Sequence, residues 1–270
     1  MSMATTGNPM HEPVALSIIT PVLNGIEHIA HCMENVRRHA GTAYEHVIVD
    51  GGSTDGTLAV VRSALATDPR IRLLTGPDRG QSHAMNKGVA AARGDVIGFL
   101  NVDDEYLAGG PAMAVANLQT APRPSLFWGA CEIDFQGHAR NWIQKPWRLK
   151  AWRLLAGWTF GQHPVNPASY FYHRSLHDVA GPYREDEHFV MDLEFIARAT
   201  PFLRSVLCTE QTIGRFHHTA RTKTHAYEQR PDRFAHEDRL LAPLRLRLSW
   251  RDRVKCEACR CGWRIWKRLR

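Results

Sequence analysis

Residues 94–104 read GDVIGFLNVDD, a short apolar run that ends in the adjacent carboxylates Asp103 and Asp104. A run of this length is typical of one buried strand, and ligands of open parallel sheets bind outside the carboxyl ends of such strands. Two carboxylates fixed there repel each other unless a cation or a proton lies between them. Hard oxygen ligands suit Mg²⁺ or Mn²⁺, which carry substrate phosphates. The stretch therefore predicts a site for a metal ion and a diphosphate. A strand followed by an ordinary Asp-rich turn is the alternative, because it has the same sequence pattern.

Strand and helix patterns alternate on the N-terminal side of this stretch. Strand-like runs at 14–20, 45–50, 71–74 and 95–100 are separated by helical patterns at 26–39, 55–66 and 81–92. Strands that alternate with helices predict βαβ units, and hence an α/β fold with a mainly parallel, Rossmann-like central sheet flanked by helices.

The pattern is looser beyond residue 111. It predicts a helix at 112–119, mixed strands near 126–135, a helix at 192–199, a strand within 204–214 and a polar helical region over 221–248 that Pro231 interrupts. We therefore expect a flexible N-terminus over 1–13 and one domain over 14–220, with halves at 14–110 and 111–220. A helical, basic extension is expected over 221–270.

Composition places the chain among ordinary globular proteins, with 44% hydrophobic and 23% charged residues. The N-terminus lacks the pattern of a signal peptide, and no run approaches the roughly 18 apolar residues of a membrane span, so a cytoplasmic location is expected. Cys256, Cys259 and Cys261 form a C-x-x-C-x-C pattern. A closed zinc site needs four ligands, and no second pair follows.

Residues 249–270 contain eight basic and two acidic residues, so six of the seven net positive charges lie in this segment. Tryptophans are interleaved with the basic residues, a mixture that is typical of segments at a membrane surface. The segment thus predicts peripheral contact with the inner face of a membrane. A solvated tail, or a helix packed on the rest of the protein, would have a similar composition. We expect no nucleic-acid partner.

Polar loops follow two further strands. Asp50 ends the strand at 47–49 and precedes GGSTDGT at 51–57, whereas the first strand ends in Thr20, Pro21, Val22 and Asn24. The glycines allow a tight turn and close approach of a ligand, but neither the dinucleotide fingerprint nor the P-loop pattern is present. The strand ends together predict one cleft, with Asp50 and the 103–104 pair on its floor.

These residues resemble the family 2 glycosyltransferases, which have the GT-A fold. The resemblance rests on four ordered motifs at 17–24, 47–57, 77–88 and 94–104, and it covers roughly residues 14–218. It implies an enzyme that moves a sugar from a nucleotide-diphosphate donor, commonly a UDP-sugar, to a hydroxyl of a glycan or lipid-linked acceptor with inversion. It also implies Mn²⁺ or Mg²⁺ as cofactor, and polysaccharide or glycolipid assembly as the setting.

The resemblance also assigns roles to individual residues. It places Asp50 on the donor base, the loop from Thr20 to Asn24 beside the nucleoside, Asp78 and Arg79 on the nucleotide, and Asp103 on the metal ion and the donor phosphates. Asn101 stands where the family often has a first Asp, so Asp104 is expected to supply the second contact to the metal ion or a contact to the ribose. His83 likewise stands where related sequences often have Asp.

An inverting transfer needs a general base near the acceptor hydroxyl. Residues 181–198 are similar to the family's acceptor-side motif, which places the base on Asp192, although Met191 replaces the usual Glu. A helix cap is the alternative role for Asp192. By the same resemblance, Asn166, Ser169 and Tyr170 line the acceptor side. His217 completes the metal shell or binds phosphate, unless it belongs to a surface histidine pair.

Two other functions fit parts of the sequence. A nucleotidyltransferase also combines a nucleotide-binding α/β sheet with metal carboxylates, but it has no need of the helix around Asp192. A catalytically silent nucleotide-sugar-binding protein would explain Met191 and Asn101, because a fold alone does not establish activity.

Overall fold

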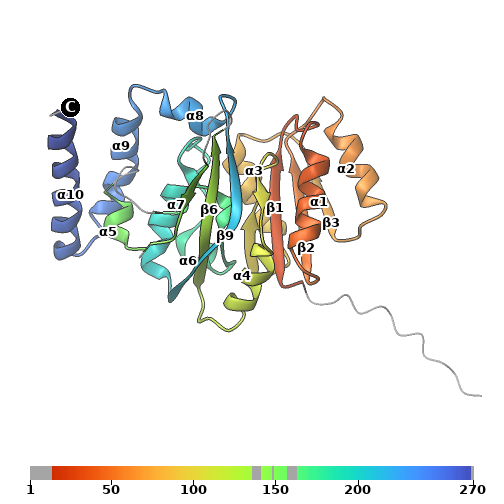
Figure 1. Ribbon diagram of the computed structural model, residues 1–270, viewed down its shortest axis with the longest axis horizontal. Coiled ribbons are helices and arrows are strands. Elements are labelled where there is room, and N and C mark those ends of the chain that lie inside the picture. Colours follow the sequence, from red (N-terminus) through yellow and green to blue (C-terminus); the bar gives the residue numbers. More distant parts are fainter. Residues whose placement is uncertain (1–13, 136–140, 148, 157–162, 269–270) are drawn as a thin grey trace, which may run out of the picture.

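The computed structural model describes residues 14–135, 141–147, 149–156 and 163–268. Its described strands form one sheet in the order β3-β2-β1-β4-β8-β6-β9-β5, with β7 paired to β6 (Figure 1). The strands are β1 (Leu16–Val22), β2 (Tyr44–Asp50), β3 (Ile71–Thr75), β4 (Val96–Phe99), β5 (Glu105–Tyr106), β6 (Ser125–Phe135), β7 (Trp142–Gln144), β8 (Tyr170–His173) and β9 (Ser205–His218).

Helices cover both faces of this sheet. They are α1 (Ile29–His39), α2 (Thr57–Leu65), α3 (Gln81–Ala91), α4 (Gly110–Leu118), α5 (Ala151–Leu154), α6 (Leu176–Ala180), α7 (Met191–Ala199), α8 (Lys223–Glu228), α9 (Arg233–Arg245) and α10 (Trp250–Arg268). Two short 3₁₀ helices, η1 (Pro167–Ser169) and η2 (Thr200–Phe202), complete the described elements.

The N-terminal half is the predicted βαβ arrangement. Strand β1 pairs in parallel with both β2 and β4, and β2 pairs in parallel with β3. Successive side chains of a strand point to opposite faces, so Ile18 packs with the cluster under α1 and α4, whereas Ile19 packs with the cluster under α3 and α7. A Cβ at Gly88 would lie 2.3 Å from Cγ2 of Ile19. Glycine at this position therefore lets α3 lie directly against β1.

The C-terminal half mixes strand directions. Strand β8 is antiparallel to both β4 and β6, and β9 runs parallel to β6. The predicted mixed strands near 126–135 are one long strand, and residues 170–173, for which no strand is predicted, form the central strand β8. Pro167 starts η1, and the aromatic residues that follow it are buried and suit a strand.

The last helices stack at one end of the sheet. Helices α9 and α10 lie side by side at the end away from β3 (Figure 1), and Cys256 of α10 is buried in the same cluster as Leu241 of α9. Arg260 of α10 also forms an ion pair with Asp238 of α9. Among the described helices, none is long and apolar enough to cross a membrane.

Candidate functional site

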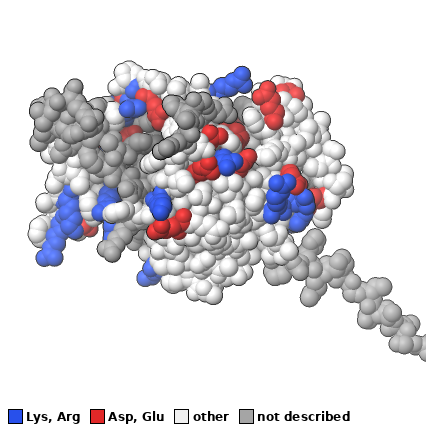
Figure 2. Space-filling model, viewed as in Figure 1, with Lys and Arg blue, Asp and Glu red and all other residues white. Residues whose placement is uncertain are grey.

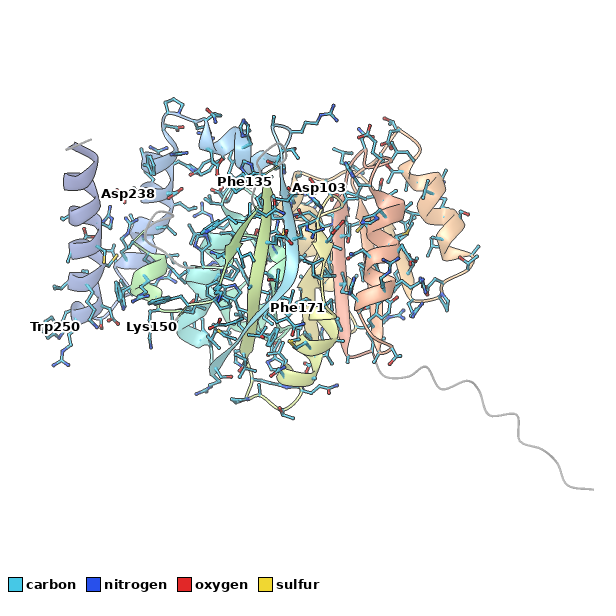
Figure 3. The ribbon with its side chains drawn as sticks, in the orientation of Figure 1. Asp103, Phe135, Lys150, Phe171, Asp238 and Trp250 are labelled. Carbon is cyan, nitrogen blue, oxygen red and sulfur yellow. The ribbon has the colours of Figure 1, made fainter. Side chains whose placement is uncertain are left out.

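A cavity of about 590 Å³ opens at the carboxyl ends of the parallel strands, the size range of small-molecule sites. It lies where Asp103 is found at the upper end of the sheet (Figure 3). The predicted site residues that line it are Pro21, Val22, Asn24, Asp78, Asp103, Asp104, Asn166 and Asp192. Segments from both halves of the chain therefore meet at one site.

The adjacent carboxylates Asp103 and Asp104 have different surroundings. Asp104 is buried, and its oxygens accept hydrogen bonds from Asn166 Nδ2 at 2.7 Å, Asn101 Nδ2 at 2.9 Å and the backbone N–H of His217 at 3.1 Å. Asp103 is half-buried, and no described residue donates a hydrogen bond to its carboxylate. Asp104 is thus held by the protein, whereas Asp103 is free to bind a ligand.

Burial raises the pKa of Asp104, and the neighbouring charge of Asp103 raises it further, while the amide donors oppose both effects. Asn101 links Asp104 to the rest of the wall, since its Oδ1 accepts from Gln81 Nε2 at 2.9 Å. Gln81 Oε1 in turn accepts from Lys223 Nζ at 3.0 Å. A chain of side-chain hydrogen bonds thus joins the strand end at 101–104 to α3 and α8.

The loop after β2 leaves one buried acceptor open. Asp50 Oδ1 accepts the backbone N–H groups of Gly52 and Ser53, each at 2.9 Å. Its Oδ2 is buried and has no hydrogen-bond partner among the described residues. A buried carboxylate oxygen without a donor is costly, and a donor from a ligand, such as the N–H of a base, would satisfy it.

The loops after β1 and β2 are tied together by Asn24. Its side-chain Oδ1 accepts from the backbone N–H of Thr54, and its own backbone N–H donates to Ser53 Oγ. Asn24 has a φ of 54°, in the left-handed region that Asn tolerates better than most residues. These bonds hold the loop after β1 in place beside the cavity.

Two residues predicted to contact the nucleotide point elsewhere. The Thr20 hydroxyl lies 2.9 Å from His46 Nε2 inside the sheet, and the Arg79 guanidinium pairs with Glu185 at 2.5 Å. Neither residue lines the cavity. Asp78 does line it, and Lys87 and His83 lie 2.8 and 3.3 Å from its Oδ1.

Asp192 comes to the cavity from the first turn of α7. It lies inside the helix, one residue after the first helical position, so it is not the helix cap. Burial raises its pKa to about 6, against the hydrogen bond that Tyr170 donates to Oδ1 at 2.7 Å. A carboxyl group with such a pKa is suited to accept a proton near neutral pH.

Behind Asp192 lies a buried cluster of tyrosines. The hydroxyl of Tyr183 lies 3.5 Å from that of Tyr170 and 3.3 Å from that of Tyr172, whose hydroxyl lies 2.9 Å from His177 Nε2. Tyr170, which belongs to this buried cluster, therefore holds the Asp192 carboxylate in place through Oδ1. The other acceptor-side residues hold the backbone, since Ser169 Oγ donates to the Asn166 carbonyl and Asn166 Oδ1 accepts from Ala168 N.

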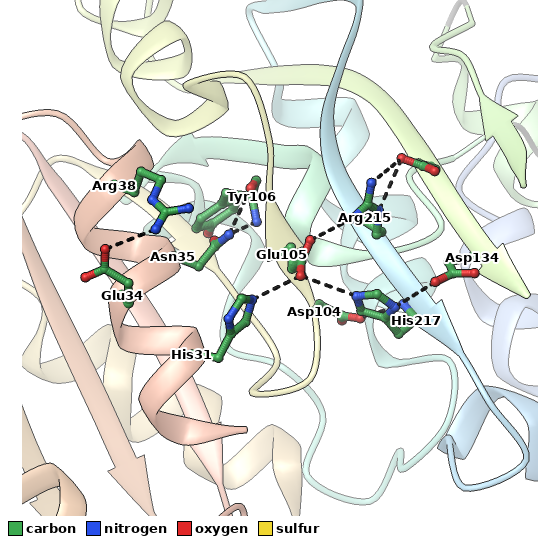
Figure 4. A network of polar contacts seen from close by, with 11 residues as sticks. His31, Glu34, Asn35, Arg38, Asp104, Glu105, Tyr106, Asp134, Arg215 and His217 are labelled. Atoms are coloured by element: carbon green, nitrogen blue, oxygen red, sulfur yellow. Dashed lines mark hydrogen bonds and ion pairs between the residues drawn. The ribbon is translucent and has the colours of Figure 1, made fainter. Parts of the chain in front are cut away.

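The ring of His217 lies in a different polar network (Figure 4). Its Nδ1 is 3.1 Å from Asp134 Oδ2 and its Nε2 is 3.7 Å from Glu105 Oε1, while its backbone N–H binds Asp104. Glu105 also pairs with His31 and Arg215. The structure thus connects His217 to the site through its backbone, and its ring does not line the cavity.

The residues at the end of β4 fit a divalent cation of the Mg²⁺ or Mn²⁺ class. Such ions are commonly held by one or two carboxylates, with substrate phosphates and water as the other ligands. Asp103 supplies a carboxylate without a protein donor at the cavity wall. The oxygens of Asp104 are already hydrogen-bonded, which favours a role in positioning Asp103.

The cavity is also lined by polar residues that the sequence analysis does not predict, among them Gln81, Arg221 and Lys223. Residues 221–224 follow the predicted domain boundary at 220, yet all of them line the cavity. The boundary itself stays a prediction. A signal was present in the sequence, because Arg221 and Lys223 follow directly on the strand that ends in the two histidines.

A mainly parallel sheet with flanking helices and a cavity at its carboxyl edge is the GT-A fold that solved glycosyltransferase structures have. The structure of "S. aureus TarS 1-349 in complex with UDP-GlcNAc" superposes with a TM-score of 0.68, at 16% identity over 91% of this chain and 70% of that one. The mannosyltransferase PcManGT from Pyrobaculum calidifontis, in complex with GDP-Man and Mn²⁺, gives a TM-score of 0.59 at 18% identity, covering 93% and 75%.

The sequence matches the family described as Glycosyl transferase family 2 over residues 17–178, and the chain belongs to this family. It is similar to "Uncharacterized glycosyltransferase YibD" of Escherichia coli K12, with 28% identity over 80% of this chain and 65% of that protein. It is also similar to a "PGL/p-HBAD biosynthesis glycosyltransferase" of Mycobacterium bovis, with 29% identity over 67% and 82%. The chain thus spans about two thirds of the length of YibD.

Proposed function

We propose that this protein transfers a sugar from a nucleoside-diphosphate donor, preferably a UDP-sugar, to an acceptor hydroxyl with inversion at the anomeric carbon. The observation that carries the proposal is the shared cavity of Asp103 and Asp192. One is a carboxylate free to bind a cation, and the other is a carboxyl group with a pKa raised to about 6. A donor-binding group and a base at one site are the requirements of this reaction.

Asp192 acts as the general base in this proposal. Tyr170 donates to its Oδ1 and leaves Oδ2 to accept the proton of the acceptor hydroxyl. The hydroxyl oxygen then attacks the anomeric carbon from the side opposite the departing diphosphate, which inverts the configuration. Asp192 ends the step protonated, and the diphosphate departs with the negative charge.

The donor is held by the other end of the cavity. Asp50 Oδ2 accepts an N–H of the base, and the loop fixed by Asn24 lies beside the nucleoside. Lys223 and Arg221 supply positive charge near the diphosphate. A divalent cation on Asp103, when bound, supplies further neutralisation of the charge that develops on the leaving group.

Titration calorimetry with UDP, GDP and CDP, each with and without Mn²⁺, tests the donor site. We expect UDP to bind most tightly and its affinity to rise with Mn²⁺. Binding that is independent of metal for all three nucleotides would contradict the donor-site assignment. Release of UDP from UDP-GlcNAc and other UDP-sugars, with glycan and lipid-linked acceptors, then separates a transferase from a silent binding protein.

We also propose that the acceptor lies at a membrane surface of polysaccharide or glycolipid assembly. Leu246, Trp250 and Val254 are exposed near the start of α10, with exposed fractions of 71%, 71% and 62%. Exposed basic residues accompany them, and Figure 2 shows basic side chains gathered at the same lower end of α10. Apolar and basic side chains on one helix suit an anionic lipid surface.

Sedimentation with phosphatidylglycerol vesicles tests this contact. Wild-type protein is expected to sediment at low salt and to be released at high salt. The double variant Trp250→Ser/Val254→Ser should bind less, while Trp142→Ser, which removes an exposed tryptophan from β7, serves as the matched control. Equal sedimentation of all three proteins would exclude α10 as the contact.

A further inference from the structure

Two histidines and a glutamate gather beside the cavity without lining it. His218 is the last residue of β9, and its side chain is 9% exposed. His225 and Glu228 are on α8, three residues apart, so they share one face of the helix. One donor atom of each of the three side chains lies within 4.8 Å of those of the other two.

Among the described residues, no Lys or Arg side chain forms an ion pair with this cluster. His218 Nε2 lies 3.0 Å from Glu228 Oε2, while Arg233 binds the backbone carbonyl of Glu228. No described residue forms a hydrogen bond with the ring of His225, which faces His218 with its ring centroid at 5.7 Å. The rings of Phe135 and Phe216 pack on His218 and exclude water from one side of the cluster.

We propose that His218, His225 and Glu228 form a Zn²⁺ site that fixes α8 to the end of β9. Two imidazoles and one carboxylate are ligands that Zn²⁺ accepts, and a fourth position stays open to water. Mn²⁺ and Mg²⁺ prefer oxygen ligands, so the site differs in donor type from the carboxylate of Asp103. Neighbouring ligand atoms of a tetrahedral zinc ion are about 3.3 Å apart. The pair His218–Glu228, at 3.0 Å, is already close to this spacing, and a rotation of the His225 side chain would bring the third ligand atom, now within 4.8 Å, to the same spacing.

The site has a structural consequence for the cavity. Helix α8 begins at Lys223, which donates to Gln81, and Gln81 donates to Asn101. We call the side of the cavity formed by Gln81, Asn101, Asp103, Asp104 and Lys223 the donor wall. Thr222 caps this helix by accepting the backbone N–H of His225. A cation that holds the face of α8 carrying His225 and Glu228 therefore holds Lys223 at the mouth of the cavity.

Titration of ZnCl₂ into the chelator-stripped, tag-free full chain tests the site. We expect one Zn²⁺ per chain, a raised Tm, and slower amide hydrogen exchange over residues 219–228 in the bound form. His225→Ala should weaken Zn²⁺ binding by more than about 100-fold. Loss of a residue that only hydrogen-bonds to a metal ligand costs at most about 100-fold, so a larger loss identifies His225 as a ligand. Glu228→Gln should weaken binding while it keeps the shape of the side chain.

Three controls separate this site from other metal ligands. Asp103→Asn, the double variant Cys259→Ser/Cys261→Ser, and His31→Ala, which breaks another His–Glu pair, should all keep one Zn²⁺ per chain. Co²⁺ bound in place of zinc should show no sulfur-to-metal absorption band. The proposal is overturned if the wild type takes up no Zn²⁺, or if His225→Ala and Glu228→Gln, with unchanged circular dichroism, bind it as the wild type does.

Discussion

On the donor wall of the cavity the buried Asp104 accepts three hydrogen bonds from amide groups, whereas on the acceptor side Asp192 accepts one from Tyr170. The donor wall is built to fix a carboxyl group in place, since Asp104 anchors the strand end and leaves Asp103 to a ligand. The acceptor side is built to exchange a proton, because burial raises the pKa of Asp192 to about 6 against the single hydrogen bond from Tyr170. The same type of side chain thus serves two purposes, because Asp104 is fixed by three amide donors whereas Asp192 keeps one carboxylate oxygen open to the cavity.

The sharpest test of this contrast is Asp192→Asn. Without a base the transfer rate should fall by about 10³-fold or more, within the range that general bases contribute, while UDP binding stays unchanged. Turnover and calorimetry on the same preparation measure both quantities. Asp178→Asn, an exposed carboxylate on α6, is the matched control. Wild-type turnover in Asp192→Asn would remove the base from this position.

Asp103→Asn tests the donor wall. Loss of the carboxylate should weaken UDP binding in the presence of Mn²⁺ by about 100-fold, because a metal contact contributes several kcal/mol. Binding without metal should change little, and calorimetry with and without Mn²⁺ measures the difference. Asp186→Asn, which removes a carboxylate paired with Arg184 outside the cavity, should behave as wild type. An equal loss with and without metal would argue against a metal-binding role.

The raised pKa of Asp192 predicts how stability depends on pH. Burial raises this pKa from 3.8 to about 6, so between these values the folded state binds more protons than the unfolded state. Stability contributed by the protonated group is present below about pH 4 and is lost as pH rises to about 6. The loss amounts to at most about 3 kcal/mol. In urea unfolding from pH 4 to 7, the free energy of unfolding of Asp192→Asn should therefore rise relative to that of the wild type. A constant difference between the two proteins over this pH range would contradict the raised pKa.

Tyr170→Phe tests the single hydrogen bond on the acceptor side. Loss of a donor to the ionised form should move the acid limb of the kcat/KM profile upward by about 0.5–1 pH unit. Activity should recover at higher pH, which a merely structural defect would not allow. Tyr172→Phe is the matched control, because its hydroxyl contacts Tyr183 and His177 and not Asp192. If the kcat/KM profile of Tyr170→Phe had the same acid limb as that of the wild type, the hydrogen bond from Tyr170 would not set the pKa of the base.

The smallest effect is expected at the far end of the donor wall. Lys223→Met removes the hydrogen bond to Gln81 and a positive charge, and should weaken UDP binding by about 3–10-fold. Lys145→Met, which removes an exposed lysine paired with Glu210, is the control. Equal affinities of the two variants in the same calorimetric assay would show that α8 adds nothing to the donor wall.

The sequence allowed the parallel half of the fold to be predicted, because its strands and helices follow each other with clear periods and end in polar loops. The family motifs also pointed to Asp103 and Asp192, which line one cavity, and to Asp50, which is buried directly before Gly51 of the cavity wall. The directions of Thr20 and the His217 ring could not be predicted, since they depend on which face of the sheet each strand residue occupies. Arg79 pairs with Glu185, 106 residues away, and no local pattern reports such a contact.

The hydrogen-bonded chain from Lys223 through Gln81 to Asn101 also bears on the order in which the protein is made. Asn101 leaves the ribosome long before Lys223, which lies 142 residues after Gln81. A nascent chain that ends near residue 200 already contains Asp103 and Asp192, but it lacks β9, whose His217 N–H holds Asp104 in place. The donor wall is therefore complete only after β9 and Lys223 have been made, and a chain that stops before them lacks the hydrogen bond that holds Asp104 beside Asp103.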